Sequence, residues 1–95
     1  MALPRITTDI ERIDRMVCAR YGVTAEDLVR RGRGAGAAKF VAVELACRLT
    51  GMSQRAIGER YGGMTSAAVS NIRRRIREGH YPLADVVGDL LARLS

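Results

Sequence analysis

The stretch SQRAIGERYGGMTSAAVSNIRRRIREG, residues 53–79, contains two short helical patterns separated by a pair of glycines. Ser53 is of a type that caps helix N-termini, Thr65 or Ser66 can cap the second pattern, and Gly79 ends it. Two short helices joined by a tight turn that contains glycine form the helix-turn-helix pattern. The stretch therefore predicts this motif, with a second helix that ends in four arginines within five residues.

The apolar residues and glycines of the stretch fit this prediction. Gly58 falls where the two helices must approach each other, so that a larger side chain would push them apart. Ile57, Val69 and Ile72 recur at helical spacing and predict the apolar wedge that sets the angle between the helices. The pair Gly62–Gly63 makes the turn one residue longer than in the commonest version of the motif.

The outer face of the second helix has the residue types of a helix that reads a DNA groove. At about 100° per residue, the side opposite Val69, Ile72 and Ile76 carries small polar residues first and arginines later. Asn can pair with adenine and Arg with guanine, each for about 1–3 kcal/mol of discrimination. Complementing the helix dipole, the alternative role, explains only one or two of the arginines. We expect Thr65, Ser66, Ala67, Ser70, Asn71 and Arg74 to contact bases, and Arg73, Arg75 and Arg77 to contact phosphates.

The charge of the chain agrees with a polyanionic partner. Its 95 residues carry a net charge of +6, and the pI is near 10.3. Residues 53–79 hold six arginines against two glutamates, whereas residues 80–95 are net negative. A basic charge concentrated in one segment indicates a directed patch and not solubility alone.

A second basic segment, RRGRGAGAA at residues 30–38, is interrupted by three glycines. The glycines predict a loop or a frayed helix start. Arginines on such an arm can reach phosphates or enter a minor groove, although a plain solvated connector has the same composition. We expect Arg31, Arg33 and Lys39 to contact the DNA backbone or the adjacent minor groove.

Two further helices are predicted ahead of this loop. Thr8 and Glu11 have the spacing of a capping box for a first helix, which Gly22 ends. Thr24 then caps the short helix AEDLV. In the first helix the expected inward residues are Ile10, Ile13, Val17 and Tyr21, and the expected outward ones are Glu11, Arg12, Asp14, Arg15 and Arg20.

The segment KFVAVELACRLTG, residues 39–51, is apolar on all sides and predicts the central helix of the core, with Gly51 as a left-handed C-cap. Residues 82–94 predict a last amphipathic helix with Pro82 in its first turn. The composition is 47% hydrophobic but only 4% aromatic, which favours packed helices over a sheet sandwich. We predict an all-α fold, a small multi-helix bundle that contains the helix-turn-helix.

The predicted helices divide the chain into two parts. Residues 1–79 are expected to form the helix-turn-helix DNA-binding domain. Residues 80–95 are expected to add an amphipathic helix that either packs on the core or mediates a homodimer, and the sequence leaves both open.

Several function classes lack the residues to carry them. His80 is the only histidine, and Cys18 and Cys47 stand apart, so we expect no metal site and two reduced core thiols. No nucleophile–base pair or catalytic carboxylate pair can be assembled, so we expect no enzyme, no cofactor and no small-molecule substrate. Single-stranded RNA needs stacking aromatics, for which only Tyr81 is available. No signal peptide or membrane-spanning run is present, so we expect a cytoplasmic, nucleoid-associated protein.

From residue 10 to residue 76 the chain resembles the C-terminal DNA-binding domain of the replication initiator DnaA. That domain carries the motifs IxxIxxxVxxxYxV, DLxxxxR, an Ala- and Leu-rich helix ending in Thr, and xIGxxFGG. Several motifs in the same order are far more specific than one. The matching residues are 10–23, Asp27-Leu28 with the arginines after it, Leu49-Thr50 and 57–63.

The resemblance implies a Trp-repressor-like helix-turn-helix that binds double-stranded DNA in the major groove. After the two glycines the initiators carry RDHTTV, whereas residues 64–69 here are MTSAAV and keep only Val69. The family's first basic residue on the Ala-Leu helix is matched by Lys39, but the Arg two residues earlier is Ala37. We therefore expect the fold to carry over and the base preference not to. The GxxxxGK[ST] loop of the initiator ATPase is absent, so we expect no complete initiator.

Two alternatives accompany this interpretation. TSAAVSNIRRRI, residues 65–76, is similar to the DnaA-like tails of REP-associated transposases, so the chain could be the DNA-binding module of such a protein. Alternatively, the leucine-rich residues 80–95 could make a protein-interaction or dimerisation module whose basic face is merely solvated.

Overall fold

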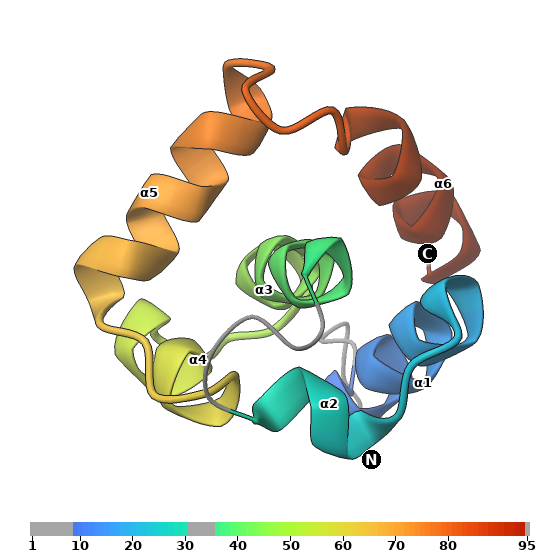
Figure 1. The fold of residues 1–95 in the computed structure, drawn as a ribbon, viewed down its shortest axis with the longest axis horizontal. Coiled ribbons are helices and arrows are strands. Elements are labelled where there is room, and N and C mark those ends of the chain that lie inside the picture. The colour runs from blue at the N-terminus through green and yellow to red at the C-terminus, as the bar shows by residue number, and fades with distance from the viewer. Residues whose placement is uncertain (1–8, 31–35, 95) are drawn as a thin grey trace, which may run out of the picture.

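The computed structural model describes residues 9–30 and 36–94, and every regular element among them is an α-helix. One helix occupies the middle of the molecule and the others surround it (Figure 1). The predicted all-α bundle is confirmed. The helices are α1 (Ile10–Tyr21), α2 (Ala25–Val29), α3 (Ala37–Leu49), α4 (Gln54–Arg60), α5 (Ser66–Arg77) and α6 (Ala84–Leu94).

Helix α3 is the central helix, as predicted. It packs against each of the other five helices, with α5 on one side of it and α1 and α6 on the other (Figure 1). Every residue from Ala38 to Ala46 except the partly buried Phe40 is buried. A helix with neighbours all around it has to be apolar on all sides, which explains the continuous apolar run in the sequence.

The predicted end of α3 at Gly51 is wrong. The C-cap is Thr50, which is extended with φ −111°, and Gly51 is not among the glycines with positive φ. The Thr50 hydroxyl donates to the carbonyl oxygen of Ala46 at 2.7 Å and accepts from the amide of Met52 at 3.2 Å. Because this side chain satisfies the helix end, no left-handed residue is needed there.

The helix start predicted at Thr8 is also wrong. Thr8 lies outside the described residues, and the N-cap of α1 is Asp9, whose carboxylate accepts from the amide of Glu11 at 3.0 Å. The two neighbouring residues both have capping side chains, so spacing alone could not choose between them. The end of α1 at Gly22, with φ 67°, and the N-cap of α2 at Thr24 are as predicted, and Thr24 also forms a capping box with Asp27.

Helix α6 lies against α3 and α1. It begins at Ala84, two residues later than the sequence predicts, and Pro82 precedes it in a turn closed by the Leu83 amide and the Tyr81 carbonyl at 2.8 Å. The apolar side chains that α6 and its leading turn bury in the core are Leu83, Val87, Leu90 and Leu94.

Candidate nucleic-acid interface

The helix-turn-helix is formed by α4, a glycine turn and α5. The Ser53 hydroxyl accepts from the Ala56 amide at 3.1 Å and caps α4, as predicted. Of the two candidates for the cap of α5, the structure uses Thr65, whose hydroxyl accepts from the Ala68 amide at 3.1 Å. The turn residues Gly62 and Gly63 have φ of 96° and 76°, a region that residues with a β-carbon rarely adopt.

Gly58 allows the turn to fold back on α4. The amide of Met64 donates to the Gly58 carbonyl at 2.8 Å. A β-carbon on Gly58 would collide with the Met64 carbonyl oxygen and would lie 3.3 Å from Cγ2 of Val69 in α5. The predicted close approach is confirmed, and its tightest neighbour is the backbone of the turn.

The same turn lies over the end of α2 and the start of α3. A β-carbon on Gly62 would lie 2.8 Å from the Arg30 carbonyl oxygen and 2.9 Å from Nζ of Lys39. Lys39 is only 4% exposed, and its ammonium donates to that Arg30 oxygen. Burial lowers the pKa of Lys39.

Lys39 therefore does not lie on the accessible basic surface where the sequence analysis put it. Arginines occupy positions 30, 31 and 33 ahead of it in the sequence, but its position in the first turn of α3 faces the core. An ammonium with three donors can bind backbone oxygens there. The structure assigns Lys39 to holding the Arg30 carbonyl, at the end of α2, beside Gly62 of the helix-turn-helix.

Replacing Lys39 with Met is expected to lower stability without changing the charge that meets DNA. The Arg30 carbonyl would lose a charged donor, which costs about 1–3 kcal/mol in unfolding free energy. Because no phosphate contact is removed, the slope of log K against log salt for a random-sequence duplex should stay the same. A slope reduced by about one unit would contradict this and restore Lys39 as a phosphate contact.

Two buried carboxylates orient α4 and α5, and the first is Asp14 of α1. Its Oδ2 accepts from Nη2 and Nε of Arg60 at 2.6 and 3.2 Å, and its Oδ1 accepts from the Tyr61 hydroxyl at 2.5 Å. Burial raises the pKa of Tyr61 far above its ordinary value, so the hydroxyl keeps its proton and donates. The expectation that Asp14 faces solvent is wrong. The sequence signal for this burial is its position four residues after Ile10 and three before Val17, which is the spacing of the inward face of α1.

The second buried carboxylate is Glu44 of α3, which is 3% exposed. It accepts from Nε of Arg48 at 2.5 Å and from Nε of Arg73 at 3.0 Å. Arg73 is thereby turned from α5 toward the core, so it anchors the helix instead of extending from its outer face. The sequence analysis missed Glu44, whose only signal was an acid inside an otherwise apolar run.

The other residues predicted to contact DNA lie on the outer face of α5, except Arg31 and Arg33. Arg31 and Arg33 lie outside the described residues. Nη2 of Arg74 donates to Oδ1 of Asn71 at 2.6 Å, so two of the six residues expected to contact bases pair with each other across one helical turn. Asn71 is partly buried, and the exposed members are Thr65, Ser66, Ala67, Ser70, Arg74, Arg75 and Arg77.

Tyr81 is not a free stacking platform. Its ring is stacked on Phe40 with centroids 4.8 Å apart and an interplanar angle of 9°, and the Arg75 guanidinium lies 6.0 Å from its centroid. The one aromatic that could have served single-stranded RNA is therefore engaged within the protein. This arrangement also holds Arg75 at the end of α5.

Within residues 9–30 and 36–94, no group of three or more His, Cys, Asp or Glu side chains could hold a metal ion. The same residues contain no helix long and apolar enough to cross a membrane. Cys18 and Cys47 are unpaired and half-buried, and burial raises the pKa of both thiols.

No protein-family model matches the chain. It is similar to the chromosomal replication initiator protein DnaA of Methylacidiphilum infernorum (isolate V4), with 38% identity over 77 residues. The DnaA of Sphingopyxis alaskensis (strain DSM 13593 / LMG 18877 / RB2256) is 39% identical over 77 residues. Each match covers 79% of this chain and 17% of the initiator, so the chain spans a small part of these relatives. The resemblance to DnaA expected from the motifs is confirmed.

Proposed function

From its homology to a segment of DnaA, we propose that the chain binds double-stranded DNA with α5 in the major groove. The observation that carries the proposal is the outer face of α5, where small polar side chains at the N-terminal end are followed by exposed arginines. A B-DNA major groove admits one α-helix, and small side chains let its backbone approach the base edges. The module would act in the cytoplasm on the nucleoid.

Burial and ion pairing reduce the number of arginines and lysines that we propose as DNA contacts. Arg75 and Arg77 are exposed, and neither has an ion-pair partner among the described residues, so they are the proposed phosphate contacts. Lys39 leaves that set because it is buried on the Arg30 carbonyl, and Arg73 leaves it because its guanidinium is paired with Glu44 of α3. Arg31 and Arg33 stay proposed contacts on sequence grounds alone.

Sequence preference is assigned to the pair Asn71 and Arg74. Asn71 can read adenine only through both atoms of its amide, so its oxygen has to leave the Arg74 guanidinium. When the Asn71 amide leaves Arg74, the Arg74 guanidinium becomes free to bind guanine or a phosphate. The remaining proposed base contacts, Thr65, Ser66, Ala67 and Ser70, are small enough to permit the approach.

Substituting Asn71→Ala and Arg74→Ala together is expected to abolish preference among duplexes and leave most of the nonspecific affinity. Each lost bidentate contact removes about 1–3 kcal/mol of discrimination. The measurement is a selection of sites from random duplexes with the native chain, followed by competition binding of the selected and scrambled sites. Unchanged selectivity in the double variant would reject the assignment.

The matched control is Arg75→Gln with Arg77→Gln, which also changes two residues of α5. These substitutions should weaken binding to every duplex alike and reduce the salt slope by about two units. If neither pair changes duplex binding, α5 is not the DNA-contacting helix and the proposal fails.

The dimer alternative is weaker in the folded chain. The apolar residues of α6 are used on the core, and only Val86 and Leu91 remain half-buried on its surface. A dimer interface through residues 80–95 would depend on this small apolar area. Light scattering of the native chain measures its molar mass and so shows whether it is a monomer or a dimer. The DNA-binding tail of a transposase-related protein would use the same face of α5, but both matched relatives are initiators.

A further inference from the structure

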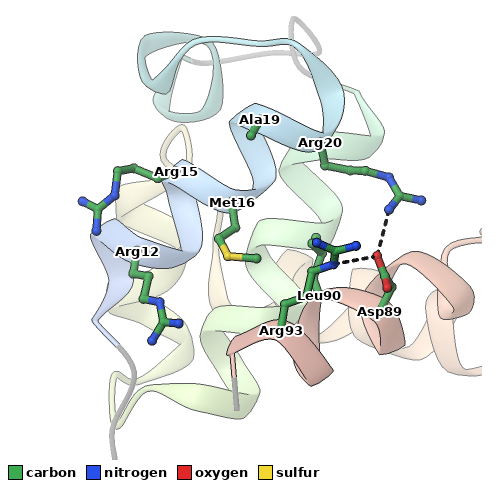
Figure 2. A pocket seen from close by; sticks show the side chains of 8 residues that line it. All are labelled: Arg12, Arg15, Met16, Ala19, Arg20, Asp89, Leu90 and Arg93. Atoms are coloured by element: carbon green, nitrogen blue, oxygen red, sulfur yellow. Dashed lines mark hydrogen bonds and ion pairs between the residues drawn. The ribbon is translucent and has the colours of Figure 1, made fainter.

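Helices α1 and α6 lie on the side of α3 away from α5 (Figure 1). Side chains of these two helices line a basic groove. Its volume is about 500 Å³, and four arginines line it. Arg12, Arg15 and Arg20 come from α1, and Arg93 comes from α6 (Figure 2). The function proposed for α5 uses none of them.

The positive charge of the groove is only partly compensated. Among the described residues that line it Asp89 is the one acid, and its Oδ2 lies 3.0 Å from Nη1 of Arg20 and 3.4 Å from Nε of Arg93. Arg12 and Arg15 form no ion pair with any residue in 9–30 or 36–94. Four arginines against one aspartate leave a local charge of +3. Such a concentration of like charge favours an anionic occupant.

The groove also has an apolar floor. Met16 projects from α1 toward α6, and Leu90 lies on the facing side of α6 (Figure 2). Leu90 is 2% exposed, so the accessible apolar surface of the groove is that of the half-buried Met16 packed beside it. The short side chain of Ala19 leaves room beside them. A flexible thioether can adapt to an apolar partner side chain.

We propose that this groove binds an acidic segment of a partner protein, with an apolar side chain against Met16 and flanking carboxylates on Arg12 and Arg15. A peptide fits better than a second DNA duplex, because a peptide can place an apolar side chain on Met16 between the arginines, whereas phosphates gain nothing from an apolar contact. The proposal does not rest on DNA binding by α5. If both hold, the domain presents one face to the duplex and the opposite face to a protein.

The test begins with random short peptides displayed on phage and selected against the full chain at about 0.1 M salt, where surface charges are still felt over about 10 Å. Enriched sequences should carry Asp or Glu on either side of Leu, Ile, Phe or Met. Fluorescence anisotropy of one enriched peptide then measures its affinity for the native chain and its variants. Absence of acidic enrichment overturns the proposal.

Arg12→Gln with Arg15→Gln should weaken the peptide about tenfold, since each exposed charge pair contributes modestly. Both side chains are exposed and unpaired among the described residues, so folding should persist. Asp89→Asn should strengthen the peptide by about twofold to fivefold, because Arg20 and Arg93 are released. A gain of affinity cannot arise from misfolding.

The matched control is Arg75→Gln with Arg77→Gln, which removes the same charge from α5. It should leave peptide affinity unchanged and lower duplex affinity. Arg12→Gln with Arg15→Gln should instead lower peptide affinity and leave duplex affinity unchanged. Equal weakening of the peptide by both pairs would show general attraction and overturn the proposal. Loss of duplex affinity in the groove variants would make the groove part of a DNA interface, which also overturns it.

Discussion

Gly58→Ala is expected to destabilise the chain by about 3 kcal/mol or more, because the added methyl group collides with a backbone carbonyl that cannot rotate away. The Met64 oxygen that it would strike belongs to the turn, and that turn is held by the bond from the Met64 amide to Gly58 itself. Relief therefore requires the turn to move and α5 to tilt. Thermal and urea unfolding measure the loss, and duplex affinity should fall in the fraction that remains folded.

Gly88→Ala provides the matched control. Gly88 also lies inside a helix, but a β-carbon there has no neighbour within 4 Å. Alanine should therefore raise the free energy of unfolding by about 0.5–1 kcal/mol through helix propensity alone. If the two variants have similar stability, the close approach at Gly58 does not constrain the motif.

Asp14→Ala is expected to lower the free energy of unfolding by about 3 kcal/mol, a large share of the roughly 5–14 kcal/mol typical of a domain of this size. The substitution leaves the fully buried Tyr61 hydroxyl without its acceptor and removes the carboxylate from Arg60. These contacts tie α1 to α4, so the helix-turn-helix loses its attachment to the first helix. Chemical denaturation of both proteins gives the difference.

The double variant Asp14→Ala with Tyr61→Phe separates the two causes. Phe removes the orphaned hydroxyl, so the double variant should be more stable than Asp14→Ala by about 1 kcal/mol. Tyr61→Phe alone should be mildly destabilising. Strict additivity of the two substitutions would mean that the hydroxyl and the carboxylate do not interact.

The elements that the sequence predicts well depend on residues within one helical turn. Ser53, Thr24 and Gly22 begin or end helices as expected because a cap acts on backbone groups two to four positions away. The predicted caps at Thr8 and Gly51 are wrong because a neighbouring residue can act on the same backbone groups. Asp9 beside Thr8, and Thr50 beside Gly51, are equally capable caps, and only the path of the chain selects one of them.

The sequence also shows the amphipathic faces of α5 and α6, because an apolar stripe at helical spacing has to be covered. It does not show which charged side chains enter the core. From the sequence, Lys39 is predicted to be a surface cation and Asp14 a surface acid, whereas both are buried.

By itself, then, the sequence determined the six-helix pattern, the glycine turn and the sign of the charge on each segment. Only the tertiary structure decided where Asp14 and Glu44 point, since their partners Arg60 and Arg73 are 46 and 29 residues away in the chain. A charged group is buried when docking supplies a partner that offsets its desolvation, and spacing along one helix carries no information about that partner. The basic groove between α1 and α6 has the same origin, because it exists only where two helices from opposite ends of the chain meet.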